Sequence, residues 1–237
     1  MKVEILFPEI CNLCGDLTNI RYLKQSCPEL EIVETDLKSR PRFLDEDIAL
    51  VYLGSATEKG LELIVKALSP VRDELAAKLD NGQRMLVTGN ALDALGQYAE
   101  SDWDWHLDGL GILPTHAEYH MMNRHNSFYL GKFGDMDIVG FKSLFGHTYG
   151  FPEGEALFQT VKGIGRNNTT KEEGWHRGNL YATYLTGPLL VLNPPFAKYL
   201  LSEMGVPCEH LAFEEAAMDA YRIRVAEFSE ENRSWQY

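Results

Sequence analysis

The hydrophobic positions in the first part of the chain fall into short runs separated by polar turns. "KVEILF" (2–7) alternates apolar and polar residues, which predicts a strand. "LEIVET" (30–35), "DIALVYLG" (47–54) and "RMLVTG" (84–89) are further short apolar runs. The last two runs are nearly continuous, as in strands that are buried on both faces of a parallel sheet.

Helical patterns separate these strands. The loop "CNLCGDLTN" runs into a helix that we expect to be capped near Asp16. Apolar residues recur at helical spacing over 57–79, and Pro70 predicts a break or restart there. Strands that alternate with helices predict a doubly wound α/β fold with a mostly parallel sheet, whose carboxyl edge carries the site.

The pattern changes after Trp103. "LDGLGIL", "SFYLGKF", "MDIVGFK" and "ALFQTV" are short segments with glycine at the turns, which is typical of a β-meander. "NLYATYLTGPLL" returns to a buried strand, and "PPFAKYLLSEMG" and "FEEAAMDAYRIRVAEF" predict amphipathic helices. With no internal repeat and no linker, we expect one domain over 1–237, with a β-rich second half that covers or extends the sheet.

Charge and composition exclude several classes of protein. The chain has 237 residues, enough for a full core, and its 22 Lys and Arg against 35 Asp and Glu give a net charge of −13. No basic cluster could hold a phosphate backbone, so nucleic acid is not an expected partner. The apolar runs are strand-length, and Glu4 interrupts the start of the chain. We therefore expect a cytoplasmic protein with no membrane contact.

Four cysteines in a chain of this size predict reduced thiols rather than a disulfide framework. Cys11 and Cys14 form a C-x-x-C pair, which a redox centre or half of a metal site would use. His116 and His120 could supply the other half, but they lie far along the sequence, and Cys27 and Cys208 are isolated in it. Loop cysteines without metal or cofactor are the favoured interpretation.

The stretch "RMLVTGNALDALGQ" runs from a strand through a sharp turn toward a helix, and it places Thr88 at the bend. Hydrolases and amidotransferases hold a nucleophile in such an elbow, where backbone amides stabilise an oxyanion. A hydroxyl nucleophile needs a base within hydrogen-bond reach. We favour a structural threonine whose hydroxyl bonds a turn amide.

Other residues are candidates for weaker reasons. His147 and His176 lie in glycine-flanked turns, where a histidine more often bonds a backbone carbonyl than carries a proton. Trp103, Trp105 and His106 lie between acidic residues and fit an aromatic cover over the sheet better than a binding patch.

Several stretches, taken in order, resemble class I glutamine amidotransferase domains. They are "NLCGDLTNI", "ALVYLGSATE", "MLVTGNALDALG", "LDGLGIL", "IVGFKSLFGHTY" and "NLYATYLTGPLL". The resemblance spans nearly the whole chain and is strongest to the cobyric acid synthase type and to the glutaminase subunit of lipid II isoglutaminyl synthase. It implies a flavodoxin-like α/β sandwich and, in active members, glutamine hydrolysis by a cysteine nucleophile and a histidine base.

The resemblance also identifies departures from the family pattern. Thr88, Gly89 and Asn90 stand on the family's Cys-Gly-Gly elbow, followed by a helix one residue longer, and Thr186 stands where the family has its histidine. In the loop after the third strand, "LGSATE", only Gly54 remains of the glycines whose amides help to form the oxyanion hole.

Ligand binding could persist without that chemistry. Arg124 stands where the family would contact the carboxylate of glutamine. We therefore expect Gly54, Gly89, Asn90, Arg124 and His147 to be ligand-binding positions. Glutamine or another small carboxylate is the expected ligand, with no metal and no cofactor.

Three functions follow from these observations. The first is a silent structural or regulatory subunit of an ATP-dependent amide ligase, with a synthetase of the Mur type as partner, in cell wall biosynthesis. The second is an active glutaminase that uses Cys14, or a hydrolase that uses Thr88 with His147. The third is a ligand sensor with a carboxylate pocket at Arg124 and Gly89.

Overall fold

A six-stranded, mostly parallel sheet forms the centre of the molecule in a computed structural model that describes residues 1–232, 234 and 236. Its order is β13-β14-β4-β3-β1-β2. These strands are β1 (Lys2–Leu6), β2 (Glu31–Thr35), β3 (Leu50–Leu53), β4 (Met85–Thr88), β13 (Trp175–Arg177) and β14 (Leu180–Thr183). Only the edge strand β13 is antiparallel to its neighbour. The predicted parallel sheet is confirmed, and the second half of the chain extends it.

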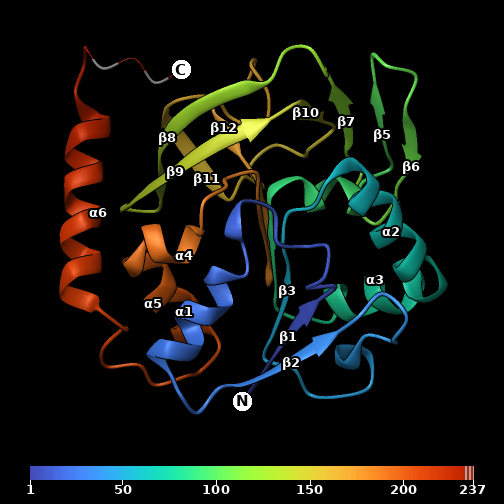
Figure 1. Cartoon of the computed structure of the whole chain (residues 1–237), viewed down its shortest axis with the longest axis horizontal. Coiled ribbons are helices and arrows are strands. Elements are labelled where there is room, and N and C mark those ends of the chain that lie inside the picture. The colour runs from blue at the N-terminus through green and yellow to red at the C-terminus, as the bar shows by residue number, and fades with distance from the viewer. Residues whose placement is uncertain (233, 235, 237) are drawn as a thin grey trace.

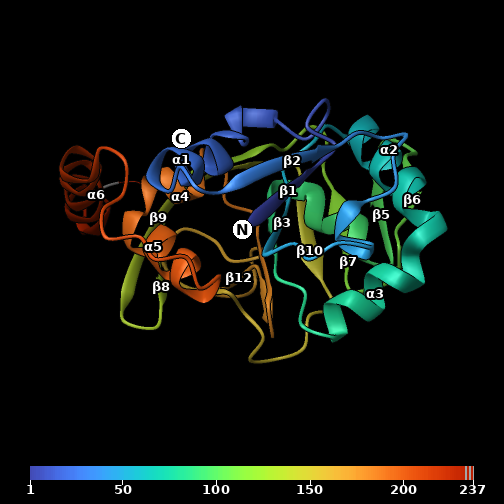
Figure 2. The same ribbon diagram turned by 90° about the horizontal axis from the view of Figure 1, so that it is seen from below.

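Helices cover both faces of this sheet, as Figure 1 shows. Helices α1 (Thr18–Ser26), α4 (Leu189–Leu192) and α5 (Pro194–Glu203) lie on one side, and α2 (Glu58–Leu68) and α3 (Arg72–Asp80) lie on the other. The turned view of Figure 2 shows the same layers. Side chains alternate along β3, so that Val51 and Leu53 pack under α2 while Leu50 and Tyr52 pack under α1.

Two antiparallel or mixed sheets complete the structure. One has the order β10-β7-β5-β6, and the other has the order β12-β11-β8-β9. The first contains β5 (Tyr98–Ser101), β6 (His106–Asp108), β7 (His116–Tyr119) and β10 (Gly146–Tyr149). The second contains β8 (His125–Phe133), β9 (Met136–Leu144), β11 (Phe158–Lys162) and β12 (Glu172–Glu173). Helix α6 (Glu214–Ser229) packs on β8 and β9 through Phe128, Tyr221 and Phe228.

Several predicted boundaries are confirmed. Thr57 caps α2 by accepting a hydrogen bond from the Gly60 amide, and Pro70 lies in the 3-10 turn that separates α2 from α3. Pro195 falls in the first turn of α5, where its missing N–H has no intrahelical partner to lose.

Other predictions are wrong in detail. The helix expected after the elbow is a short 3-10 helix, Gly89–Leu95. In "LDGLGIL" only the first part is strand, because the amides of 109–113 bond the carbonyls of 94–97. The strand expected to run from 179 to the turn at Gly187 and Pro188 ends earlier, at Thr183, and α4 follows Pro188. Trp105 packs on the core, whereas Trp103 is 60% exposed and does not cover the sheet. No helix among the described residues is long and apolar enough to span a membrane.

Candidate functional site

A pocket of about 230 Å³ opens where the loops after β1, β3 and β4 meet the β-rich half of the molecule. This is the carboxyl edge of the parallel strands, where ligands of open α/β sheets bind. Its lining comes from both halves of the chain: Leu13, Cys14, Ser55, Ala56, Thr57, Glu58, Gly89, Asn90, Asp93, Tyr119, Arg124, Ser143, Leu144, Phe145, Gly146, Tyr184 and Thr186.

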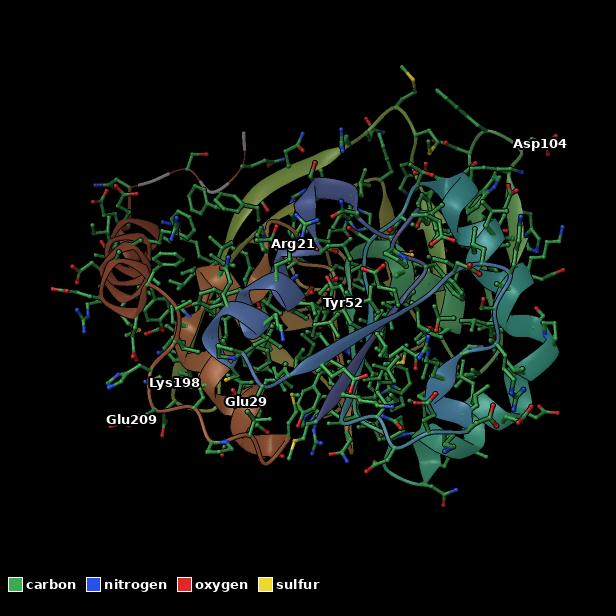
Figure 3. All side chains as sticks on the ribbon, turned by 60° about the horizontal axis from the view of Figure 1, so that its bottom comes forward. Arg21, Glu29, Tyr52, Asp104, Lys198 and Glu209 are labelled. Carbon is green, nitrogen blue, oxygen red and sulfur yellow. The ribbon has the colours of Figure 1, made fainter. Side chains whose placement is uncertain are left out.

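Thr88 lies beneath this pocket rather than in its wall. It is the last residue of β4, it has extended backbone angles, and it is fully buried. Its hydroxyl donates to the Asp16 carboxylate over 2.7 Å and lies 2.9 Å from the hydroxyl of Tyr52. Figure 3 shows Tyr52 at the centre of the molecule. Thr88 is therefore structural, but it bonds a carboxylate and a phenol rather than the expected turn amide.

The bend itself falls one residue later, at Gly89. This residue has a φ of +61° and lines the pocket. A Cβ atom at position 89 would lie 2.4 Å from the Cβ of Ser55, far inside van der Waals contact. The Ser55 hydroxyl donates to the carbonyl of Leu13 over 2.9 Å, which holds Ser55 in that place. Ser55 thus occupies the space that a side chain at the bend would need.

Side chains of the protein accept hydrogen bonds from the amides of the loop after β3. The Ser55 amide donates to the Asp16 carboxylate over 2.8 Å, and the Ala56 amide donates to the Asn90 side chain over 3.1 Å. Burial raises the pKa of Asp16, and the hydrogen bonds from Thr88 and Ser55 partly oppose that rise. Donors that the resemblance assigns to an oxyanion hole are therefore engaged inside the protein.

Gly54 has a packing role. A Cβ atom there would lie 2.5 Å from the carbonyl oxygen of Cys11, so only glycine lets the loops after β1 and β3 approach this closely. Gly54 does not belong to the pocket lining. Asn90 does, and its side chain is held by the Ala56 amide.

Thr186 lies on the opposite wall of the pocket. Its amide and its hydroxyl both donate to the carbonyl of Phe141, over 2.8 and 3.2 Å. Within the part of the chain that the structure describes, the pocket lining contains no histidine. The site therefore has no imidazole base in its walls.

Cys14 and Arg124 lie together at this pocket. Cys14 has a left-handed φ of +59° in the 3-10 turn Leu13–Gly15. Partial burial and the charge of Asp16 raise the pKa of its thiol, and the charge of Arg124 partly lowers it. The Arg124 guanidinium stacks 5.1 Å from the centre of the Phe145 ring. The pocket thus brings a thiol and a guanidinium together.

The floor of the pocket carries a buried carboxylate that no sequence pattern pointed to. Asp93 accepts hydrogen bonds from Tyr119 over 2.6 Å, from Tyr184 over 2.7 Å and from Thr148 over 3.3 Å. Burial raises its pKa to about 6, while these hydroxyl donors limit the rise. The three donors come from β7, the end of β14 and β10, which are far apart in the sequence.

The remaining candidate residues lie elsewhere. His147 is in β10 outside the pocket lining, and its buried Nδ1 has no hydrogen-bond partner among the described residues. Burial, and then the charge of His120, lower its pKa. The Thr88 hydroxyl bonds Asp16 and Tyr52 instead of His147, so the structure does not form the Thr88–His147 pair. His176 stacks on Tyr181 at the sheet edge.

The C-x-x-C residues are separated by their environments. Cys11 is fully buried, and burial followed by the charges of Glu9 and Asp16 raises its pKa to about 12. Cys14 is exposed. The described residues contain no group of His, Cys, Asp or Glu that could hold a metal ion. Cys27 and Cys208, isolated in the sequence, are neighbours in the fold.

Comparison with known proteins shows that this chain is similar to glutamine amidotransferases. Residues 3–193 match the CobB/CobQ-like glutamine amidotransferase domain. The lipid II isoglutaminyl synthase (glutamine-hydrolyzing) subunit GatD of Staphylococcus aureus (strain N315) is 25% identical over 230 residues, 94% of each chain. The subunit of the same name from Streptococcus pneumoniae (strain ATCC BAA-255 / R6) is 24% identical over 210 residues, 85% of this chain and 79% of that protein.

A solved structure described as a glutamine amidotransferase shares the fold. It has a TM-score of 0.58 and 16% identity, over 86% of this chain and 99% of that one. The family match covers most of the sequence, including every strand of the central sheet. This chain therefore belongs to the CobB/CobQ-like glutamine amidotransferase family.

Proposed function

We propose that this protein is a non-hydrolysing amidotransferase-like subunit that supports or regulates an ATP-dependent amide ligase. The contact between Gly89 and Ser55 carries the proposal, because it leaves no room for a nucleophilic side chain at the bend. We therefore place Gly89 at the nucleophile position, so that Gly89, Asn90 and Ala91 stand on the family's Cys-Gly-Gly elbow in place of Thr88, Gly89 and Asn90. With this assignment the helix after the elbow needs no extra residue.

Two further features support the absence of hydrolysis. The amides of Ser55 and Ala56 are held by Asp16 and Asn90, so an oxyanion would have to displace acceptors that are already in place. Thr186 stands at the base position and cannot take a proton as an imidazole does. Loss of the nucleophile or base of a covalent mechanism typically costs on the order of 10⁴ to 10⁶ in rate, so this site would be silent.

The partner is inferred from the relatives. Both GatD proteins are described as subunits of a glutamine-hydrolyzing synthase, so we propose that this chain also acts beside a synthetase, an ATP-using ligase of the Mur type. A structural subunit needs the fold and its surfaces but not the chemistry of the pocket.

Measurement of ammonia release from glutamine tests this proposal. The purified chain, alone and with any Mur-type ligase encoded next to it, is expected to show no turnover above background. The Staphylococcus aureus GatD subunit, assayed with its own synthase, serves as the positive control. Co-purification with the ligase is expected to persist. Turnover well above background would overturn the non-hydrolysing assignment, and a chain that never associates with a ligase would overturn the subunit assignment.

One observation favours an active enzyme as the second candidate. Cys14 brings a thiol to the pocket. Burial and the charge of Asp16 raise the pKa of this thiol, and the charge of Arg124 lowers it. No histidine lines this pocket within the described chain, and the raised pKa leaves little thiolate near neutral pH. Cys14→Ser distinguishes the candidates, because it would abolish turnover by this route and change nothing in a silent subunit.

Ligand binding is a separate part of the proposal. Arg124 lines the pocket together with Glu58 and Asp93. Because a guanidinium binds carboxylates, we propose that Arg124 holds a small carboxylate such as that of glutamine. Calorimetry with glutamine and glutamate should give binding heat that Arg124→Gln removes. Arg177→Gln, at an exposed ion pair with Asp80, is the matched control and should leave that heat unchanged. Absence of heat with the unsubstituted protein would contradict this part.

A further inference from the structure

Two cysteines from distant parts of the sequence meet on the face of the molecule formed by α1 and α5. Cys27 follows α1 and is 2% exposed, and Cys208 lies in the connection between α5 and α6. Cys208 is half-buried and packs on the hydrophobic cluster that contains Cys27. Its Sγ lies 4.0 Å from the carbonyl oxygen of Ser26, the residue before Cys27.

The surrounding chain holds these two thiols in place. The Ser26 hydroxyl donates to the carbonyl of Tyr22 over 2.8 Å and accepts from the Ala212 amide over 3.0 Å. The segment between α5 and α6 is therefore hydrogen-bonded to the end of α1 at Ala212, a few residues after Cys208. Figure 3 shows Glu29, Lys198 and Glu209, from the segments around this contact, on the same side of the molecule.

The thiols also interact electrostatically. Burial first, and then the neighbouring Cys208 thiol, raise the pKa of Cys27 to about 12. The Tyr22 hydroxyl is buried without a hydrogen-bond partner among the described residues. Burial, and then the charges of Glu214 and Cys208, raise its pKa.

Cys11 and Cys14 lie in different environments. Cys11 is fully buried in the core, whereas Cys14 is exposed at the pocket. Cys208 also lies beyond residues 3–193, the part of the chain that matches the family.

We propose that Cys27 and Cys208 form a disulfide by exchange with a low-molecular-weight disulfide. The Cys208 sulfur, which is the more exposed, attacks first as a thiolate and forms a mixed disulfide while one small thiol leaves. The Cys27 thiolate then attacks the Cys208 sulfur, breaks the mixed disulfide and releases the second small thiol. Two protein thiols are oxidised, the small disulfide is reduced, and the two protons pass to the released thiols.

The bond would join the end of α1 to the connection that leads into α6. It closes a long loop, so it restricts the unfolded chain strongly. Because α1 follows the turn that carries Cys14 and Asp16, the bond would also restrain one wall of the candidate pocket. The Cys27–Cys208 pair is thus a redox-sensitive cross-link that does not depend on glutamine chemistry.

Thiol counting and peptide mapping test the proposal on the full-length native protein. Incubation with oxidised glutathione, followed by alkylation in denaturant, should lower the free thiols from the four of the reduced chain to two. Mass spectrometry without reductant should show a peptide that links Cys27 to Cys208. The melting temperature should rise by roughly 4–12 °C, and dithiothreitol should reverse it.

Variants separate this pair from the other cysteines. Cys14→Ser should retain the linked peptide, and Cys208→Ala should lose it while keeping the circular dichroism of the reduced protein. Glutathione that stays on Cys208 beside a free Cys27, or a peptide that links Cys11 to Cys14 instead, would overturn the proposal. The mapping uses the unsubstituted chain, so it stands even if Cys208→Ala folds poorly.

Discussion

At the residue scale, the contact between Gly89 and Ser55 shows how two substitutions can depend on each other. A side chain at the bend requires space that Ser55 fills, and a serine in the loop after β3 requires glycine at the bend. Each residue therefore makes the other difficult to change alone. The carboxylate of Asp16 reinforces this arrangement because it bonds both the Ser55 amide and the Thr88 hydroxyl.

Gly89→Cys should destabilise the protein, and Ser55→Gly should relieve part of the loss. We expect a coupling energy of about 1–3 kcal/mol between the two positions, typical of an overpacked contact. Urea denaturation of the two single variants and the double variant measures it. Gly111→Cys is the control, because Gly111 has the same φ of +61° and a Cβ atom added there would meet no atom within 4 Å. Equal losses at positions 89 and 111 would show that backbone strain, not Ser55, is responsible.

The same variants test the proposed absence of glutamine hydrolysis. Gly89→Cys combined with Ser55→Gly should still release no ammonia, because Thr186 supplies no base. Addition of Thr186→His should be the first step that gives measurable turnover. Turnover by Gly89→Cys alone would contradict the occlusion by Ser55.

Asp93 predicts a pH dependence of stability. Its pKa rises from the ordinary 3.8 to about 6 in the folded protein. Between these values the unfolded chain releases a proton that the folded protein keeps, so stability falls as pH rises, by about 3 kcal/mol in total, and is level above pH 6. Asp93→Asn lacks this penalty. Its stability relative to the parent should therefore increase from pH 4 to pH 6, as measured by urea denaturation at each pH. A constant difference over that range would argue against a raised pKa.

At the scale of elements, a buried ion pair joins the β-rich half to the central sheet. Lys142 of β9 and Glu173 of β12 are both fully buried and form an ion pair. Glu173 also accepts from the hydroxyl of Thr183 and the amide of Tyr184, at the end of β14. Burial lowers the pKa of Lys142, and the charge of Glu173 opposes that effect. The pair thus fixes Tyr184, whose hydroxyl donates to Asp93 in the pocket.

Removal of one partner should leave an uncompensated buried charge. Lys142→Met is expected to cost about 3–5 kcal/mol, measured as the free energy of unfolding in urea. Lys59→Met, which breaks the exposed pair with Glu62, should cost less than about 1 kcal/mol. Similar losses in the two variants would indicate that the buried pair is not a structural junction.

At the scale of the whole molecule, we expect one cooperative unit. The three hydrophobic clusters lie on the two faces of the sheet and under α6. Asn193, which precedes α5, exchanges hydrogen bonds with the backbone of Val139 in β9. Tyr221 of α6, which lies beyond the family-matched part, donates to the carbonyl of Asp137 in the same strand over 2.9 Å.

Calorimetric unfolding should therefore show a single transition, with a van't Hoff enthalpy equal to the calorimetric one. The reduced protein is the form to use, because a disulfide between Cys27 and Cys208 would add a second species. Two resolved transitions, with α6 and the sheet of β8, β9, β11 and β12 melting apart, would contradict a single domain.

The sequence by itself determined the layers of the central α/β fold. Alternation and continuous apolar runs follow from burial on a sheet face, so β1, β3 and β4 could be located from local pattern alone. Pro70 acts through its own backbone and Thr57 through a side-chain hydrogen bond to the nearby Gly60 amide, so both are local signals, and the structure retains them.

Only the tertiary structure decided which side chains meet. The bend after β4 lies at Gly89, where the backbone has a positive φ, rather than at Thr88. Ser55 fills the space beside that bend because the loops after β3 and β4 lie against each other. The hydroxyls that donate to Asp93 come from β7, β10 and the end of β14. Cys27 and Cys208 are far apart in the sequence and neighbours in the fold. Local propensity carries no record of such contacts, because they are set by how the elements pack and not by the residues beside them in the chain.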